Sequence, residues 1–116
     1  MAQKIITAPL TKTNFQDFGE VIDTGGDPDM LINQGVCERY HDRAKIDVGP
    51  DGKVGLSLFN AETRSLPLVL KMMERHPDGS QAFIPMSTNG FLVIVANDKN
   101  NKPDIPKAFV SAPGHA

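Results

Sequence analysis

Short apolar segments separated by glycine and proline run along the whole chain. Positions Val54, Leu56 and Leu58 alternate with polar or small residues, which is the pattern of a strand with one buried face. Patterns of this kind predict strands at 4–8, 20–22, 40–48, 54–59, 81–85 and 91–96, and another that begins at 107–110. One short helical turn is expected, N-capped by Thr13 and running through Asp17. The pattern therefore predicts an all-β fold with one or two short helices.

The segment from Leu66 to Arg75 fits either a strand or a helix by its length. As a strand it points Met72, Glu74 and His76 to one inward face, together with the leucines before them. On a helix, Glu74 and His76 would diverge by about 200°. We predict a strand here, because only the strand brings these two polar side chains together.

Residues 74–85, ERHPDGSQAFIP, hold the most informative polar pattern. Glu74 and His76 precede a Pro-Asp-Gly turn signal, and Gln81 follows it on the returning segment. A carboxylate, an imidazole and a carboxamide can together ligate a divalent metal, transfer protons or hold a small polar acid. The alternative interpretation is the polar end of a hairpin on a solvated sheet face.

A second polar pattern lies at 33–42, NQGVCERYHD. Arg39 and His41 share a face if this segment is a strand, and Glu38 and Tyr40 share the other. Arg39 can form a bidentate pair with a substrate carboxylate. The alternative is a surface pair of Arg39 with a glutamate on an edge strand.

Composition narrows the class of protein. With 116 residues, 40% hydrophobic and 22% charged, the chain has the composition of one soluble domain. A formal net charge of −2 gives no electrostatic basis for binding nucleic acid. The longest apolar run, 91–96, is too short to cross a bilayer, and no apolar stretch follows the N-terminus as in a signal peptide. One cysteine allows no internal disulfide, so we expect a cytoplasmic protein.

Several motifs together resemble the ureidoglycolate lyase family along essentially all of the chain. They are PLT with FGEVI (9–11 and 18–22), IN.G…ERYHD (32–42), LPL (66–68), MERHPDGSQAFIPM (73–86) and FLVIVA followed by KPD. The resemblance implies a small cupin-like antiparallel β-barrel or jelly roll that is usually a homodimer. It implies cleavage of (S)-ureidoglycolate to glyoxylate and urea in allantoin degradation, with a divalent metal, nickel (Ni²⁺) in some descriptions of the family.

The resemblance and the residue chemistry together give the expected site. Glu74 and His76 are the expected catalytic residues, and with Gln81 they are the expected metal ligands. The expected substrate-binding residues are Asn33, Arg39, His41 and Gln81. A partner subunit is expected to cover 56–59 or 91–95, because unpaired strands are normally covered.

The sequence departs from the family pattern at its end. Family members continue into a segment of the type GVNYHRxxWHHP, whereas this sequence reads SAPGHA there. We therefore expect residues 1–116 to be one cupin-like domain truncated at its C-terminus, with weak or no activity, and His115 to be disordered. The alternatives are a non-catalytic cupin that binds small acids, an inactive fragment that pairs with a partner, and a different cupin enzyme.

Overall fold

The computed structural model describes residues 3–111 of the chain, and the contacts between residues divide it into two units. Unit 1 consists of residues 1–45 and 82–116, and unit 2 of residues 46–81. Every strand and the short helix of the described residues lie in unit 1. The expectations for SAPGHA beyond Ser111, including disorder at His115, concern residues outside those described. That residues 1–116 form a single domain stays a prediction.

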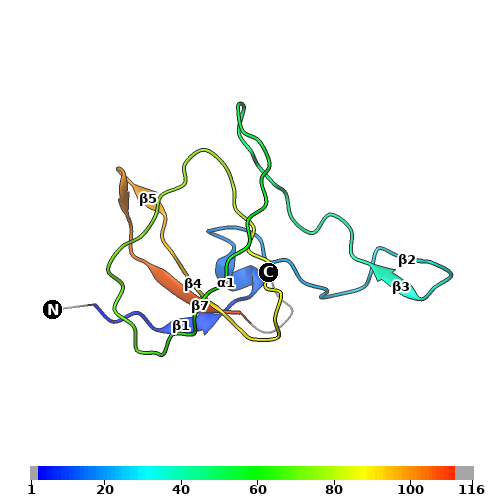
Figure 1. The fold of residues 1–116 in the computed structure, drawn as a ribbon, viewed down its shortest axis with the longest axis horizontal. Helices are drawn as coiled ribbons and strands as arrows, with labels where there is room; N and C mark the ends of the chain where they lie inside the picture. The colour runs from blue at the N-terminus through cyan, green and yellow to red at the C-terminus, as the bar shows by residue number, and fades with distance from the viewer. Residues whose placement is uncertain (1–2, 112–116) are drawn as a thin grey trace. The chain divides into compact units, whose positions relative to one another are not determined.

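The main sheet of unit 1 has three strands in the order β1-β7-β4 (Figure 1). Its central strand β7 (Lys107–Val110) is parallel to β1 (Thr7–Pro9) and antiparallel to β4 (Leu92–Val95). The sheet is therefore mixed, and the expectation of a purely antiparallel fold is wrong at this pair. Almost the whole chain lies between β1 and β7, which is ample for the long crossover that a parallel pair needs.

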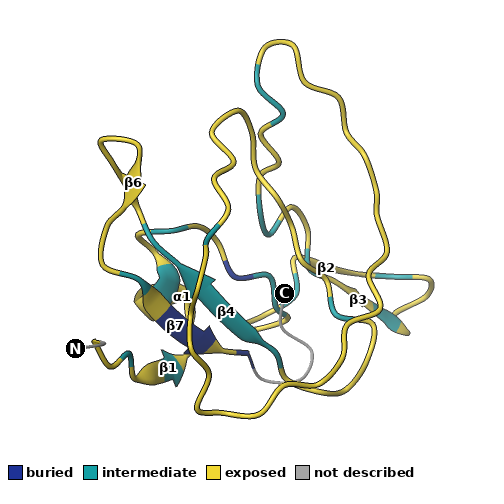
Figure 2. Ribbon diagram, turned by 60° about the vertical axis from the view of Figure 1, so that its left-hand side comes forward, coloured by how far each residue is buried: buried dark blue, intermediate teal, exposed yellow. Residues whose placement is uncertain are grey.

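The two strands predicted in the last third of the chain are confirmed. The predicted strand at 91–96 contains β4, and the strand predicted from 107 coincides with β7. All four residues of β4 are only half-buried, although the run 91–96 is apolar without interruption. The reason is that β4 lies at the edge of the sheet, whereas β7 lies in the middle and buries Ala108 and Phe109 (Figure 2).

Aromatic rings form the centre of the core. Phe109 on β7 contacts Phe15 and Phe18, with ring centroids 5.2 and 6.0 Å apart. The angles between the ring planes are 81° and 63°, respectively. Leu10 and Val21 are buried beside them. Helix α1 (Lys12–Phe15) carries Phe15 into this cluster. The core of unit 1 is therefore made from the two ends of the sequence.

Helix α1 begins earlier than predicted. Thr11, not Thr13, is the N-cap, and its side-chain oxygen accepts a hydrogen bond from the Asn14 backbone nitrogen at 3.0 Å. The Asn14 side chain also donates to the Pro9 carbonyl oxygen at 2.9 Å, which ties the helix start to the end of β1. This attachment to the end of β1 selects between two threonines of equal capping ability.

A hairpin joins β2 (Met30–Ile32) to β3 (Cys37–Arg39) in antiparallel register. Its turn contains consecutive residues with positive φ, among them Asn33 at 53°. Asparagine tolerates this left-handed conformation better than most residues. The hairpin places the 33–42 pattern on a two-stranded ribbon.

A second, short hairpin lies between β4 and β7 in the sequence. Strands β5 (Asp98–Lys99) and β6 (Lys102–Pro103) pair across Asn100 and Asn101, whose φ angles are 54° and 65°. Two consecutive positive φ values are the requirement of the tight turn that best matches strand twist. Asn100 and Asn101 therefore form the turn of this hairpin.

Much of the expected strand content is absent from the described residues. The segments without regular strand structure are 20–22, 40–48, 54–59, 66–75 and 81–85. A strand needs a partner for its backbone groups, and alternation in the sequence does not supply one. The all-β class is confirmed, since α1 has only four residues and all other regular elements are strands. Residues 3–111 contain no closed barrel, and in this range no helix has the length and apolarity to span a membrane.

Candidate functional site

Hydrogen bonds between the two ends of unit 2 hold the turn that follows His76. The backbone nitrogen of Asp47 donates to Ser80 Oγ at 2.8 Å, and the Ser80 nitrogen donates to the Asp47 carbonyl oxygen at 2.7 Å. Gly49 has a φ of 72°, and a Cβ there would lie 2.5 Å from the Asp78 carbonyl oxygen. Glycine is therefore required at position 49. The turn around Pro77-Asp78-Gly79 is held by contacts with residues 47–49, which are distant from it in the sequence.

Glu74 and His76 lie side by side before this turn. Oε2 of Glu74 and Nε2 of His76 are 3.2 Å apart, which is within reach of a charge-assisted hydrogen bond. The expectation that these side chains share one side is confirmed, although the backbone is extended without being a paired strand. The side chains are 74% and 49% exposed respectively, so the described residues do not enclose the pair.

Gln81 reaches the same part of unit 2. Residues 75–81, which include His76 and Gln81, line an open hollow of about 390 Å³. Met72, expected on one inward face with Glu74 and His76, is 77% exposed. The structure thus brings Glu74 to His76, and His76 to the hollow that Gln81 lines. That the three side chains project together into a barrel stays a prediction.

The Glu74–His76 pair fits two neighbouring positions on a divalent metal. Ligands at right angles, each about 2.1 Å from an ion, lie about 3 Å apart, close to the observed contact. Among residues 3–111 no group of three or more His, Cys, Asp or Glu side chains gathers around a potential metal position. A third protein ligand in this hollow would therefore be a neutral donor, and Gln81 supplies a suitable carbonyl oxygen.

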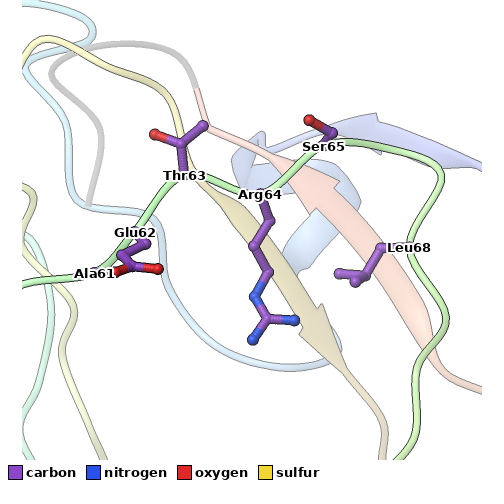
Figure 3. Close-up of a pocket in the computed structure, with 6 residues that line it drawn as sticks. All are labelled: Ala61, Glu62, Thr63, Arg64, Ser65 and Leu68. Carbon is purple, nitrogen blue, oxygen red and sulfur yellow. The ribbon is translucent and has the colours of Figure 1, made fainter.

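A larger hollow, of about 600 Å³, lies elsewhere in unit 2 (Figure 3). It is lined by Ala61, Glu62, Thr63, Arg64, Ser65 and Leu68. The sequence analysis did not single out these residues, because a scattered polar segment gives no signal of spacing. The hollow contains a guanidinium and a carboxylate but no imidazole, so it lacks the donor that makes the Glu74–His76 pair suited to proton transfer at neutral pH.

In unit 1, Arg39 and His41 lie together on the continuation of β3. Nη2 of Arg39 is 2.8 Å from Nδ1 of His41. A guanidinium has hydrogens to donate and no lone pair to accept with, so Nδ1 of His41 must be the acceptor in this contact. In this arrangement the ring hydrogen of His41 lies on Nε2, which can donate it to a ligand oxygen.

Asp29 positions this pair and was missed by the sequence analysis. Its Oδ2 accepts from the His41 backbone nitrogen at 2.6 Å, and its own nitrogen donates to the Arg39 carbonyl oxygen at 2.8 Å. The only sequence signal was its place after Asp27-Pro28. Asn33 is not brought to the pair, because it lies in the turn whereas Arg39 pairs with Met30 at the opposite end of the hairpin.

The other face of the same segment carries Glu38 and Tyr40, as the alternation predicts. The Tyr40 hydroxyl donates to Glu38 Oε2 at 2.9 Å, and this hydrogen bond raises the pKa of the Tyr40 hydroxyl above its ordinary value. Arg43 lies over the Tyr40 ring, 4.8 Å from its centroid. Nearby, the hydrogen bond from Lys45 lowers the pKa of the Asp42 carboxyl.

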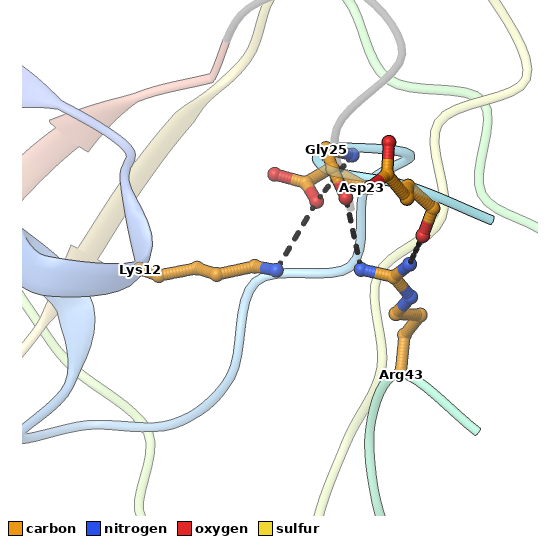
Figure 4. A network of polar contacts seen from close by, with 5 residues as sticks. Lys12, Asp23, Gly25 and Arg43 are labelled. Carbon is orange, nitrogen blue, oxygen red and sulfur yellow. Dashed lines mark hydrogen bonds and ion pairs between the residues drawn. The ribbon is translucent and has the colours of Figure 1, made fainter. Parts of the chain in front are cut away.

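Arg43 is a second residue that the sequence analysis missed (Figure 4). Its guanidinium donates to the carbonyl oxygens of Gly25 at 3.0 Å and Asp27 at 3.2 Å. Asp23 accepts from the Gly25 nitrogen at 3.0 Å and lies 3.4 Å from Lys12 Nζ. These contacts hold the glycine-rich loop 23–27 beside the 37–43 segment, a role that no local pattern indicates.

Six predicted site residues thus fall into two sets. Glu74, His76 and Gln81 belong to unit 2, and Asn33, Arg39 and His41 belong to unit 1. That the two sets line one cavity stays a prediction.

The described residues thus hold a carboxylate–imidazole pair in unit 2 and a guanidinium–imidazole pair beside the β2–β3 hairpin of unit 1. The chain belongs to the ureidoglycolate lyase family, whose model matches residues 2–116.

Curated relatives agree with this membership. A ureidoglycolate lyase of Rhodobacter capsulatus is 48% identical over 112 residues, which cover 97% of this chain and 70% of that protein. A ureidoglycolate lyase of Mesorhizobium japonicum is 49% identical over 96% of this chain and 69% of its own length. One from Chelativorans is 45% identical over 97% of this chain and 68% of its own length. The chain therefore spans about two thirds of the length of these relatives.

Proposed function

We propose that this protein cleaves (S)-ureidoglycolate to glyoxylate and urea as a carbon–nitrogen lyase in allantoin and purine degradation. Family membership over residues 2–116 and relatives named ureidoglycolate lyase support the substrate. The observation that carries the chemistry is the 3.2 Å contact between Glu74 Oε2 and His76 Nε2.

Ureidoglycolate carries a hydroxyl and a urea nitrogen on the same carbon, so its breakdown moves two protons. The hydroxyl loses its proton as the carbonyl of glyoxylate forms, and the bond from carbon to nitrogen breaks with its electrons going to nitrogen. The departing nitrogen then takes up a proton to give urea. A carboxylate and an imidazole in contact can perform both transfers, one as base and one as acid, which typically contributes about 10²–10⁴-fold to a rate.

Carboxylate recognition is the part of the proposal that rests on unit 1. Arg39 offers a permanent positive charge, and His41 offers its Nε2 hydrogen. A small 2-hydroxy acid presents one carboxylate, which two converging donors would orient. Asn33 lies at the hairpin turn, apart from Arg39 and His41, and is the third unit 1 residue of the proposed substrate-binding set.

A divalent metal, Ni²⁺ or Mn²⁺, is proposed at Glu74, His76 and Gln81. When bound, such an ion would polarise the hydroxyl and carboxylate oxygens of the substrate. Because Gln81 is neutral, the site would carry less negative charge than one built from two carboxylates, which favours an anionic substrate over tight metal binding. Metal binding is separable from turnover, since calorimetry with Ni²⁺ alone should lose its heat signal in His76→Ala.

The proposal extends to the surroundings of the site. We propose that the complete fold is of the cupin type, that two copies of the chain form a homodimer, and that the protein works in the cytoplasm. The exposed apolar side chains Leu56, Leu58 and Phe59 support a homodimer, because such a strip in contact with water is normally covered. Sedimentation at micromolar concentration tests it, and a stable monomer would contradict it.

A glyoxylate-release assay tests the catalytic proposal. The assay compares the wild-type chain with Glu74→Gln and His76→Ala, corrected for spontaneous breakdown of the substrate, with and without Ni²⁺ or Mn²⁺. We expect each variant to lose about 10²–10⁴-fold in turnover. Glu62→Gln is the matched control, because it makes the same change in the other hollow of unit 2 and should keep the wild-type rate.

The Rhodobacter capsulatus relative serves as the positive control for the assay. Turnover by the relative and none by this chain under any metal condition would agree with the weak or absent activity expected of residues 1–116. It would contradict the catalytic proposal for this chain and favour a small-acid-binding protein. Turnover by this chain that is equal in Glu74→Gln and wild type would instead remove Glu74 from the mechanism.

A further inference from the structure

Asn89 and Gly90 end an exposed loop that leads into β4. Both residues are exposed, and the backbone nitrogen of Asn89 is held by Ser87 Oγ at 3.3 Å. Within residues 3–111, the backbone nitrogen of Gly90 donates no hydrogen bond. This nitrogen is therefore free to approach the Asn89 side chain, and it belongs to a residue without a Cβ to obstruct the approach.

The fold itself requires glycine at position 90. A Cβ there would lie 2.6 Å from the Ser111 carbonyl oxygen, which is closer than real Cβ contacts allow. Ser111 is only 2% exposed, and it hydrogen-bonds both backbone groups of Phe91, the residue after Gly90. Its Oγ accepts from the Phe91 nitrogen at 3.0 Å, and its own nitrogen donates to the Phe91 carbonyl oxygen at 2.9 Å. Packing at the end of β7 thus imposes the glycine that follows Asn89.

We propose that Asn89 is a site of spontaneous deamidation in the folded protein. The Gly90 backbone nitrogen attacks Cγ of the Asn89 side chain, and the bond from Cγ to the amide nitrogen breaks. Ammonia leaves with the proton that the Gly90 nitrogen gives up, so a five-membered succinimide remains. Water then opens either carbonyl of this ring and yields aspartate or isoaspartate at position 89. The protein gains one negative charge on a formal net charge of −2.

The structure also indicates where the isoaspartate product is accommodated. Isoaspartate lengthens the main chain by one carbon between the Cα of residue 89 and the nitrogen of Gly90. Phe91 is held on both sides by Ser111, so the extra atom is taken up in the exposed loop from Ser87 onward. The modified protein therefore keeps the pairing of β4 with β7 and accumulates as a folded, more acidic form.

The experiment follows deamidation in the intact chain at mildly alkaline pH and body temperature. Peptide mass mapping gives the rate at each asparagine, and enzymatic methylation of isoaspartate identifies that product. Asn33 and Asn100 are internal controls, because both are exposed and are followed by residues with side chains. We expect Asn89 to react at least about tenfold faster than either control and, since no opening of the fold is needed, within about threefold of its rate in the urea-unfolded chain.

The variant Asn89→Gln should lose the isoaspartate signal and leave the unfolding midpoint unchanged, because the side chain is exposed. A native rate more than about tenfold below the unfolded rate would overturn the proposal, since it would show that the loop is protected and must open first. Isoaspartate that forms mainly at Asn33 or Asn100 would overturn it as well.

Discussion

Phe109→Ala should strongly destabilise unit 1. The side chain is 3% exposed, and its ring contacts two other rings, with centroids 5.2 Å from Phe15 and 6.0 Å from Phe18. Truncating a fully buried phenylalanine to alanine costs about 3–5 kcal/mol, because the transfer free energy is lost and a cavity remains. A chain of this length has a free energy of unfolding of roughly 6–17 kcal/mol. The substitution should thus remove between about a fifth and most of the stability.

Urea unfolding measures this loss. The free energy of unfolding of a small protein falls by about 1–3 kcal/mol per M of urea, so a loss of 4 kcal/mol should lower the midpoint by about 2 M. The intrinsic fluorescence of Tyr40 is a clean signal for unit 1, because the chain has one tyrosine and no tryptophan. Low protein concentration keeps association from contributing to the result.

Phe83→Ala is the matched control, since it removes the same ring from a residue of unit 1 that is 60% exposed. Its effect should stay within about 0.5 kcal/mol. A Phe109→Ala midpoint within experimental error of wild type would refute the assignment of this ring to the core. Equal losses in both variants would show that burial does not determine the cost.

Three further predictions concern hydrogen bonds. The absorbance of ionised Tyr40 should appear at lower pH in Glu38→Gln than in wild type, because the hydrogen bond to Glu38 raises the Tyr40 pKa. The stability that this bond contributes is present below about pH 10 and is lost as pH rises further. Identical titration curves of the two proteins would contradict this role of Glu38. The lowered pKa of the Asp42 carboxyl implies a contribution to stability that is present above about pH 4 and lost as pH falls. Lys45→Met should therefore make the urea midpoint fall less steeply as the pH is lowered. The same dependence of the midpoint on pH in both proteins would count against the Lys45–Asp42 pair. Ser80→Ala should lower the free energy of unfolding by about 0.5–1.5 kcal/mol in urea titrations, because the two ends of unit 2 lose side-chain hydrogen bonds, whereas no change would show that these bonds contribute nothing.

The sequence alone determined the features that depend on neighbouring residues. Alternation along an extended backbone put Glu74 beside His76, Arg39 beside His41 and Glu38 beside Tyr40, and each pair is in hydrogen-bond contact. The apolar run at 91–96 identified β4, and the strand predicted from 107 identified β7. Glycine and asparagine marked turns, because few other residues tolerate a positive φ.

Only the tertiary structure decided the features that need a distant partner. The pairing of β1 with β7 and the contact of Asp47 with Ser80 each join residues that no local pattern relates. Strands predicted at 40–48 and 54–59 are absent from the described residues. Alternation permits a strand, but a strand forms only where the edge of another strand offers partners for its backbone hydrogen-bond groups. The side-chain pairs of the candidate site therefore follow from short-range alternation, whereas the turn after His76 is held by contacts between the two ends of unit 2, at Asp47 and Ser80.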